Sequence, residues 1–184
     1  TIHAASIGQL IEPGDLVEAA EALRTSARAR NVLERVSNRA PHLAAIADQI
    51  GDLRPFTDAV ETAIDARGDV ADSASPELGT IRRELRQARD RLDQRAQAAL
   101  ADAIRRDIAQ EPLLTERNGR KVIPIKSDFR GRMPGIVHDV SSSGASVYIE
   151  PAGVVEAGNQ VRELEVAETR EVRRVLQKLA GLLG

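Results

Sequence analysis

Hydrophobic residues recur along most of the chain at spacings of three and four, the period of a helix that buries one face. One such stripe runs from Leu16 to Val36, and Asp15 is its predicted N-cap. Two shorter stripes, which begin near Pro41 and Pro55, predict two short helices. Residues 1–75 are therefore expected to form a helical core segment.

A long helix is predicted in residues 76–112. Ser75 is its expected N-cap, because a proline and an acid follow it in the first turn. The apolar stripe alternates three and four apart as far as Leu92, but Arg95 takes the next seam position and shifts the phase by one residue. That shift favours packing against short neighbours over one uniform dimeric coiled coil. At about 1.5 Å per residue, this helix would be roughly 45 to 50 Å long.

A second long helix is predicted in residues 152–184, with its start between Val154 and Asn159. Its apolar face continues to Leu183, and its opposite face mixes acids and bases, as is typical of a solvated helix surface. Two antiparallel helices joined at one end would bury both stripes. The expected fold class is mainly α, with a small β insertion at 113–151 between two long antiparallel helices.

Within the β insertion, the dipeptide Asn118-Gly119 favours a two-residue hairpin turn, in which both central residues need positive φ. A second strand pair is predicted at 135–140 and 145–149, separated by a serine-rich turn. Pro124 and Pro134 are expected at strand edges, bulges or bends, since proline cannot donate a ladder hydrogen bond. These patterns predict a small twisted sheet with loops at its tip.

Composition excludes several classes of protein. Phe56, Phe129 and Tyr148 are the only aromatic residues, so Ala, Val, Ile and Leu must build the core, and these suit close helix packing better than a roomy ligand pocket. Cysteine is absent, and no apolar run or leader resembles a membrane span or signal peptide. The chain starts with Thr1 rather than Met. It is expected to be a soluble cytoplasmic segment cut from a longer protein.

Positive charge is concentrated in the first half of the β insertion. The window from Arg117 to Arg132 holds six basic residues and one acid, so it carries +5 while the whole chain carries −2. Clustered cations on a projecting tip would neutralise phosphates without base selectivity, although strand alternation puts at most about half of them on one face. They could instead only solubilise a small edge-rich sheet. The predicted nucleic-acid-binding residues are Arg117, Arg120, Lys121, Lys126, Arg130 and Arg132.

Other chemistry is disfavoured. A hydrolytic triad of His138, Asp139 and a serine of 141–143 would demand a geometry that near neighbours across a strand end seldom meet. The histidines 3, 42 and 138 lie in different segments without metal-ligand spacing. With one Tyr and no Trp, a stacking platform for unpaired bases is not expected either. No catalytic, cofactor-binding or metal-binding residue is predicted.

Several ordered sequence motifs resemble the type-two branch of the bacterial MutS family. They span essentially the whole chain at consistent separations, which makes them more specific together than any one alone. They are Asp72–Leu78 with Ile81–Leu85, Arg117–Arg120, Pro134–Asp139, Ser141, Ser143–Gly144, Ile149–Pro151 and Arg162–Leu164 with Glu168.

This resemblance implies a fold and a division into parts. In that family the corresponding region includes part of the helical core, the two lever helices and the small clamp at their ends. Residues 1–75 would be core, 76–112 and 152–184 the levers, and 113–151 the clamp. The sequence contains no G-x-x-x-x-G-K-[ST] loop and nothing similar to the family's small MutS-related nuclease domain. This segment is therefore not expected to be an enzyme itself. The full-length proteins that it resembles use ATP and Mg and form homodimers through their ATPase domain.

Three functions remain open at this stage. The first is a clamp and lever module that binds branched or duplex DNA without sequence specificity, in suppression of recombination or in DNA repair. The second is an arm that contacts the ribosome or its RNA in rescue of stalled or collided ribosomes. The third is a structural spacer for the ATPase. Both phosphate-rich targets suit a basic tip, and no membrane partner is expected.

Overall fold

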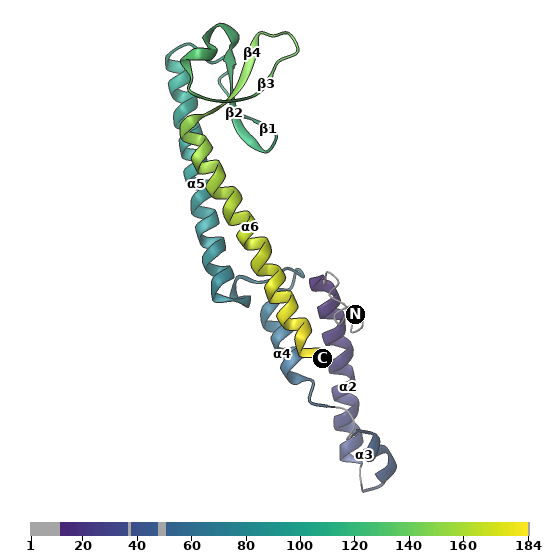
Figure 1. The fold of residues 1–184 in the computed structure, drawn as a ribbon. Coiled ribbons are helices and arrows are strands. Elements are labelled where there is room, and N and C mark those ends of the chain that lie inside the picture. The colour runs from purple at the N-terminus through teal and green to yellow at the C-terminus, as the bar shows by residue number, and fades with distance from the viewer. Residues whose placement is uncertain (1–11, 37, 48–50, 184) are drawn as a thin grey trace. The chain divides into compact units, whose positions relative to one another are not determined.

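The computed structural model describes residues 12–36, 38–47 and 51–183. The chain divides into two compact units, each built from both long helices (Figure 1). We call residues 1–80 with 168–184 the helical unit and residues 81–167 the sheet unit. The predicted fold class is confirmed, because the chain is mainly helical and a small antiparallel sheet lies between its two long helices in the sequence.

The two long helices, α5 (Pro76–Arg105) and α6 (Ala152–Ala180), run through both units. The helical unit adds α2 (Pro13–Arg35), α3 (Pro41–Ala47), α4 (Arg54–Ala63) and the short 3-10 helices η1 (Asp72–Ala74) and η3 (Gly181–Leu183). The sheet unit adds β1 (Thr115–Arg117), β2 (Arg120–Lys126), the 3-10 segment η2 (Ser127–Arg132), β3 (Gly135–Val140) and β4 (Ser146–Pro151).

Helix α2 starts two residues earlier than the predicted cap. Pro13 takes the first helical position, where its fixed φ and missing N–H cost nothing. Asp15 is therefore inside the first turn, and its Oδ2 accepts a 3.4 Å hydrogen bond from the backbone nitrogen of Glu12, the true N-cap. The prediction of Asp15 as N-cap is wrong, because the proline decides where the turn begins.

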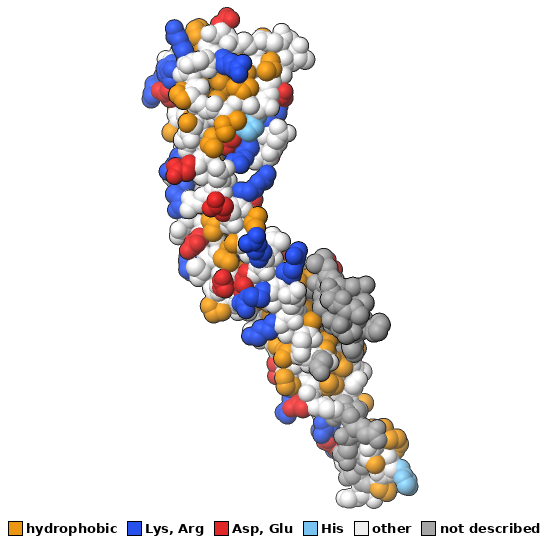
Figure 2. Space-filling view, viewed as in Figure 1, with side chains coloured by type: hydrophobic (Ala, Val, Ile, Leu, Met, Phe, Trp, Pro, Cys, Tyr) orange, Lys and Arg blue, Asp and Glu red, His pale blue; other side chains and the backbone are white. Residues whose placement is uncertain are grey.

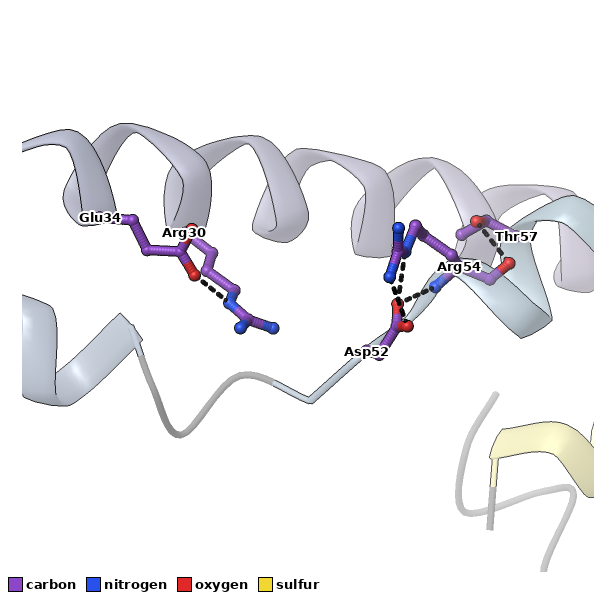
Figure 3. Close-up of polar contacts among 5 residues, drawn as sticks. All are labelled: Arg30, Glu34, Asp52, Arg54 and Thr57. Atoms are coloured by element: carbon purple, nitrogen blue, oxygen red, sulfur yellow. Dashed lines mark hydrogen bonds and ion pairs between the residues drawn. The ribbon is translucent and has the colours of Figure 1, made fainter.

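The start of α4 is held by a carboxylate just before it. Asp52 accepts hydrogen bonds from Nε, Nη2 and the backbone nitrogen of Arg54 at 2.9, 2.8 and 3.1 Å (Figure 3). The Arg54 guanidinium, followed by its backbone N–H, lowers the pKa of Asp52 to about 2. The helix then buries its apolar face in the core of the helical unit, formed by Leu16, Ala20, Phe56, Val60, Ala63, Ile64, Val70, Leu78, Val175, Leu176, Leu179 and Ala180.

Ser75 is confirmed as the N-cap of α5 and also ties that helix to α6. Its hydroxyl oxygen accepts a 2.9 Å hydrogen bond from the Leu78 backbone nitrogen and donates to Glu171 Oε1 at 2.5 Å. Glu171 in turn accepts two hydrogen bonds of 2.6 Å from the Arg174 guanidinium. Ser75 and Glu171 are both buried, so their polar atoms satisfy one another inside the helical unit.

The sheet has the strand order β1-β2-β4-β3, with every neighbouring pair antiparallel. Asn118 and Gly119 have φ of 53° and 72°, which confirms the predicted β1–β2 hairpin turn. Strand β2 pairs with β1 as far as Val122 and with β4 from Ile123 onward. One sheet face packs on the end of α5 through Leu100, Ala103, Ile123, Ile125, Val147 and Ile149.

Pro124 and Pro134 differ in position. Pro134 directly precedes β3, as expected, whereas Pro124 lies inside β2 opposite Tyr148. The carbonyl of Pro124 accepts a 2.8 Å hydrogen bond from the Gln110 nitrogen, so the Pro124 nitrogen also points to that side, away from β4. No β2–β4 ladder bond is lost. Strand β1 pairs with β2 only as far as Val122, so no described strand pairs with β2 on the side that the Pro124 nitrogen faces, and the expectation of an edge position is confirmed.

Within the sheet unit, α5 and α6 lie side by side and antiparallel (Figure 1). Their seam contains the apolar residues Leu85, Ala88, Leu92, Val161 and Leu164. Arg95, which interrupts the stripe, donates to the Gly153 carbonyl and pairs with Glu156 at 3.4 Å. Helix α6 begins at Ala152, before the predicted Val154–Asn159 start, because strand β4 passes into it without a loop.

Substitution Ser75→Ala should lower the free energy of unfolding by about 2 kcal/mol, since it removes a helix cap and a donor to a buried carboxylate. Urea denaturation followed by circular dichroism measures the change. Ser73→Ala is the matched control, because Ser73 is exposed on η1. Equal stability of the two variants would contradict the role assigned to Ser75.

Ionised Glu171 should make stability depend on pH. The Arg174 guanidinium lowers the pKa of Glu171 below its ordinary 4.5, the Ser75 hydroxyl adds to this, and burial opposes both. Since the folded pKa is the lower one, this contribution is complete above the unfolded value and is lost as pH falls through the folded value.

Glu171→Gln should therefore flatten the fall of the urea midpoint between about pH 5 and about pH 3 while lowering the midpoint at neutral pH. Exposed Glu163, replaced in Glu163→Gln, provides the control. Parallel pH profiles for wild type and Glu171→Gln would refute the assignment.

Candidate nucleic-acid interface

The structure divides the six predicted nucleic-acid-binding residues into two groups. Arg117, Arg120, Lys121 and Lys126 lie on β1 and β2, and each forms an ion pair within the sheet unit. Arg130 and Arg132 lie on η2, are exposed, and form no ion pair with any residue that the structure describes. Figure 2 shows Lys and Arg side chains around the end of the sheet unit that holds the strands.

Arg120 belongs to a buried polar network centred on Glu150. The Glu150 side chain is 2% exposed, and its two oxygens contact His138 Nε2 at 2.7 Å and Arg120 Nη1 at 3.4 Å. Arg120 also donates to Asn159 Oδ1 on α6 at 2.8 Å. A Cβ on Gly158 would lie 2.9 Å from Arg120 Nη1, so the glycine leaves the space that the network needs. The network thus joins β2, β3, β4 and α6.

Lys121 and Lys126 secure the sheet to α5. Lys121 pairs with Asp93 of that helix. Lys126 Nζ donates to the carbonyl and Oδ1 of Asp107 at 3.1 and 2.7 Å. Asp107 has φ of 52° just beyond α5, and the Ile108 nitrogen donates back to the Ala103 carbonyl at 3.0 Å, as in a Schellman cap. Lys126 therefore stabilises the end of the helix.

Arg117 reaches across the sheet face opposite α5. Its guanidinium carbon lies 4.1 Å from the centre of the Tyr148 ring, and Nε lies 3.3 Å from Asp139 Oδ2. It also donates to the Glu116 carbonyl at 2.8 Å. The side chain is 35% exposed, so Arg117 fastens β1 to β3 and β4 and presents only part of its surface to solvent.

The η2 turn presents its arginines from a fixed backbone. Arg106 Nη2 donates to the Arg132 carbonyl at 2.6 Å, and Nη1 of the same guanidinium pairs with Asp102 at 3.0 Å. The Ser127 nitrogen donates to the Ala145 carbonyl at 3.0 Å. Arg132 lies over the Phe129 ring at 5.0 Å. The turn is thus anchored to the residue that follows α5 and to the residue that precedes β4, and its two cations are exposed.

Sequence reasoning missed Glu150 and Arg106 as organising residues. The one signal for Glu150 in the sequence is an acid at the end of a predicted apolar strand, near a histidine. Arg106 gave no signal, because it is one of many arginines on the predicted helix. Both act through neighbours that are distant in the sequence.

The residues of the hypothetical triad have other partners. His138 binds Glu150, and Asp139 pairs with Arg117. Ser141 Oγ accepts a 3.0 Å hydrogen bond from the Ser146 nitrogen, which closes the turn between β3 and β4. In the described part of the chain, no group of three or more His, Asp or Glu residues could hold a metal ion, and His3 lies outside it. No described helix is long and apolar enough to cross a membrane.

Glu150→Ala should lower the free energy of unfolding by about 3 kcal/mol, because it leaves His138 and Arg120 without their common acceptor in a buried site. Chemical denaturation measures the loss. Glu156→Ala is the matched control, since the Glu156 side chain is 86% exposed, and its effect should stay within about 0.5 kcal/mol. A loss at Glu150 no greater than at Glu156 would contradict the organising role.

No family model matches the chain. The chain is similar to proteins named Endonuclease MutS2. It is 37% identical to that of Symbiobacterium thermophilum over 177 residues, which cover 96% of the chain and 22% of the relative. It is 40% identical to that of Thermomicrobium roseum over 181 residues, which cover 97% of the chain and 23% of the relative. It is 34% identical to that of a Geobacillus species over 187 residues, which cover 100% of the chain and 24% of the relative.

The chain thus spans less than a quarter of the length of these curated relatives. Similarity at this level over nearly every residue confirms the resemblance stated from the motifs. The chain is homologous to one segment of MutS2, the type-two branch of the bacterial MutS family.

Proposed function

We propose that the sheet unit is a clamp that contacts nucleic acid without sequence specificity, and that α5 and α6 are the levers of a MutS-type ATPase. The observation that carries the proposal is the pair of exposed arginines on η2, Arg130 and Arg132, which form no ion pair with a described carboxylate. The family resemblance supports it. The names of the relatives describe endonucleases, and that activity is theirs.

Phosphate contact is the chemistry that this pair suits best. Guanidinium groups match the geometry of phosphate oxygens, and neutralising phosphates releases condensed counterions. Because Arg106 and Ser127 hold the turn, little backbone ordering is needed when a phosphate binds.

The other four predicted residues act differently in this proposal. Arg117, Arg120, Lys121 and Lys126 hold the strands and the helix end in place through their ion pairs. Their charges are partly balanced by carboxylates of the same unit, so they strengthen the local field less than their number implies. Neutralising all six would damage the sheet as well as the surface, and a test of contact must therefore change only the η2 pair.

In this proposal, residues 1–75 are core, 76–112 and 152–184 are levers, and 113–151 are the clamp. The segment provides contact and reach, whereas ATP hydrolysis and any nuclease step belong to other parts of the longer relatives. Branched DNA, linear duplex and ribosomes should be compared in competition at matched salt, because the outcome separates a DNA clamp from a ribosome-directed arm.

The double variant Arg130→Gln/Arg132→Gln should weaken duplex binding and reduce the steepness of its salt dependence. Each phosphate contact contributes about 0.9 to the slope of log affinity against log salt, so losing two should reduce the slope by about 2. Fluorescence anisotropy over a salt series measures it.

The control for the double variant carries the same charge change on exposed arginines of the helical unit, Arg28→Gln/Arg39→Gln. Its salt slope should equal that of wild type. Identical slopes for all three proteins would overturn the assignment of the η2 pair, and absence of salt-sensitive binding in wild type would overturn the clamp itself.

A further inference from the structure

Both aromatic rings of the sheet unit carry an arginine guanidinium on one face. Arg117 lies over Tyr148 at 4.1 Å, and Arg132 lies over Phe129 at 5.0 Å. Both distances are within the range of a cation–π contact. The two stacks differ in what surrounds the guanidinium, and this difference points to a site on η2.

The Phe129 ring is a fixed base for Arg132. It is partly buried and packs against the sheet core that contains Ile125, Met133 and Val147. The Arg132 backbone carbonyl accepts a 2.6 Å hydrogen bond from Arg106. The core therefore holds the ring beneath the guanidinium in place, and Arg106 holds the backbone of Arg132. A ligand would find this side chain already oriented.

The chemistry of a stacked guanidinium suits a nucleobase. The group is planar, so with one face on the ring its other face remains a flat, cationic surface. Arg132 is exposed, and no carboxylate in the described residues pairs with it. Unpaired bases stack on arginine planes as well as on aromatic rings. The scarcity of aromatic residues therefore does not exclude stacking, because an arginine can supply the upper plane.

We propose that Arg132, seated on Phe129, stacks on an unpaired nucleobase while Arg130 contacts the neighbouring phosphate. This rests on the proposed phosphate contact at η2 and adds a structural preference to it. A base within a continuous duplex is covered on both faces by its neighbours, so only a looped-out or branch-point nucleotide can reach the guanidinium. DNA and RNA both offer that chemistry.

Arg117 provides the contrast within the same unit. Its guanidinium pairs with Asp139 at 3.3 Å, donates to the Glu116 carbonyl, and belongs to a side chain that is 35% exposed. These contacts engage the guanidinium of Arg117, whereas the guanidinium of Arg132 has no carboxylate partner among the described residues. Arg117→Lys is therefore a matched control for Arg132→Lys, because each keeps the positive charge and removes the planar group from an aromatic ring.

The test compares binding of the 184-residue chain to a fully matched duplex and to the same duplex with one bulged 2-aminopurine, in DNA and in RNA. Wild type should prefer the bulge by about tenfold and quench its fluorescence, as stacking of one base predicts. Arg132→Lys should lose the preference and the quenching, with less than about a threefold change on matched duplex. Phe129→Leu, which retains an apolar side chain against the core, should reproduce this loss, whereas Arg117→Lys should behave as wild type.

Each outcome decides a separate point. A wild-type chain that binds both duplexes equally, or an Arg132→Lys variant that keeps preference and quenching, overturns the stacking site and leaves the phosphate contact standing. Loss of preference in Arg117→Lys as well as in Arg132→Lys also overturns the assignment to η2. Failure of wild type to bind any of these nucleic acids overturns the proposed function together with the inference. A preference in only one of the DNA and RNA arms identifies the source of the unpaired base.

Discussion

The buried carboxylate of Glu150 is the constraint on which the sheet unit depends. Removing an ionised group from water is costly unless hydrogen bonds replace the lost solvation, and here His138 and Arg120 provide them. These partners come from β3 and β2, and Arg120 extends the network to Asn159 on α6. These groups meet in this arrangement of three strands and a helix, so the network favours it.

This use of charge explains why the tip is less basic than its composition suggests. Six cations in a short window imply a strongly positive surface, but four of them are matched by acids from elsewhere in the unit. The acids come from α5, from the residue just beyond it, and from β3 and β4. The remaining cations are confined to one turn, which makes the candidate contact surface small and distinct from the scaffold that supports it.

Local chemistry allowed much of the fold to be predicted. The Asn118-Gly119 hairpin and the Ser75 cap depend on residues within one turn of each other, and both are confirmed. Helix periodicity likewise located both long helices. The start of α6 could not be predicted, because it depends on where strand β4 ends and passes into the helix rather than on residues within one turn. The same limit applies to the candidate site. Sequence located the basic cluster but could not separate Arg130 and Arg132 from cations whose partners are distant in the chain.

Strand β2 changes partners between Val122 and Ile123, so the two parts of the sheet differ in local stability. Beyond that point β2 is paired with β4 over the core, whereas β1 has only three paired residues on the other side. Arg117 is the side chain that fastens β1 to β3 and β4, through a partly exposed contact. Edge segments with few buried contacts open at low free-energy cost. The amide hydrogens of β1 should therefore exchange with solvent well before those of β4 and of the part of β2 that pairs with β4, so β1 can loosen while the scaffold beneath the η2 turn remains closed.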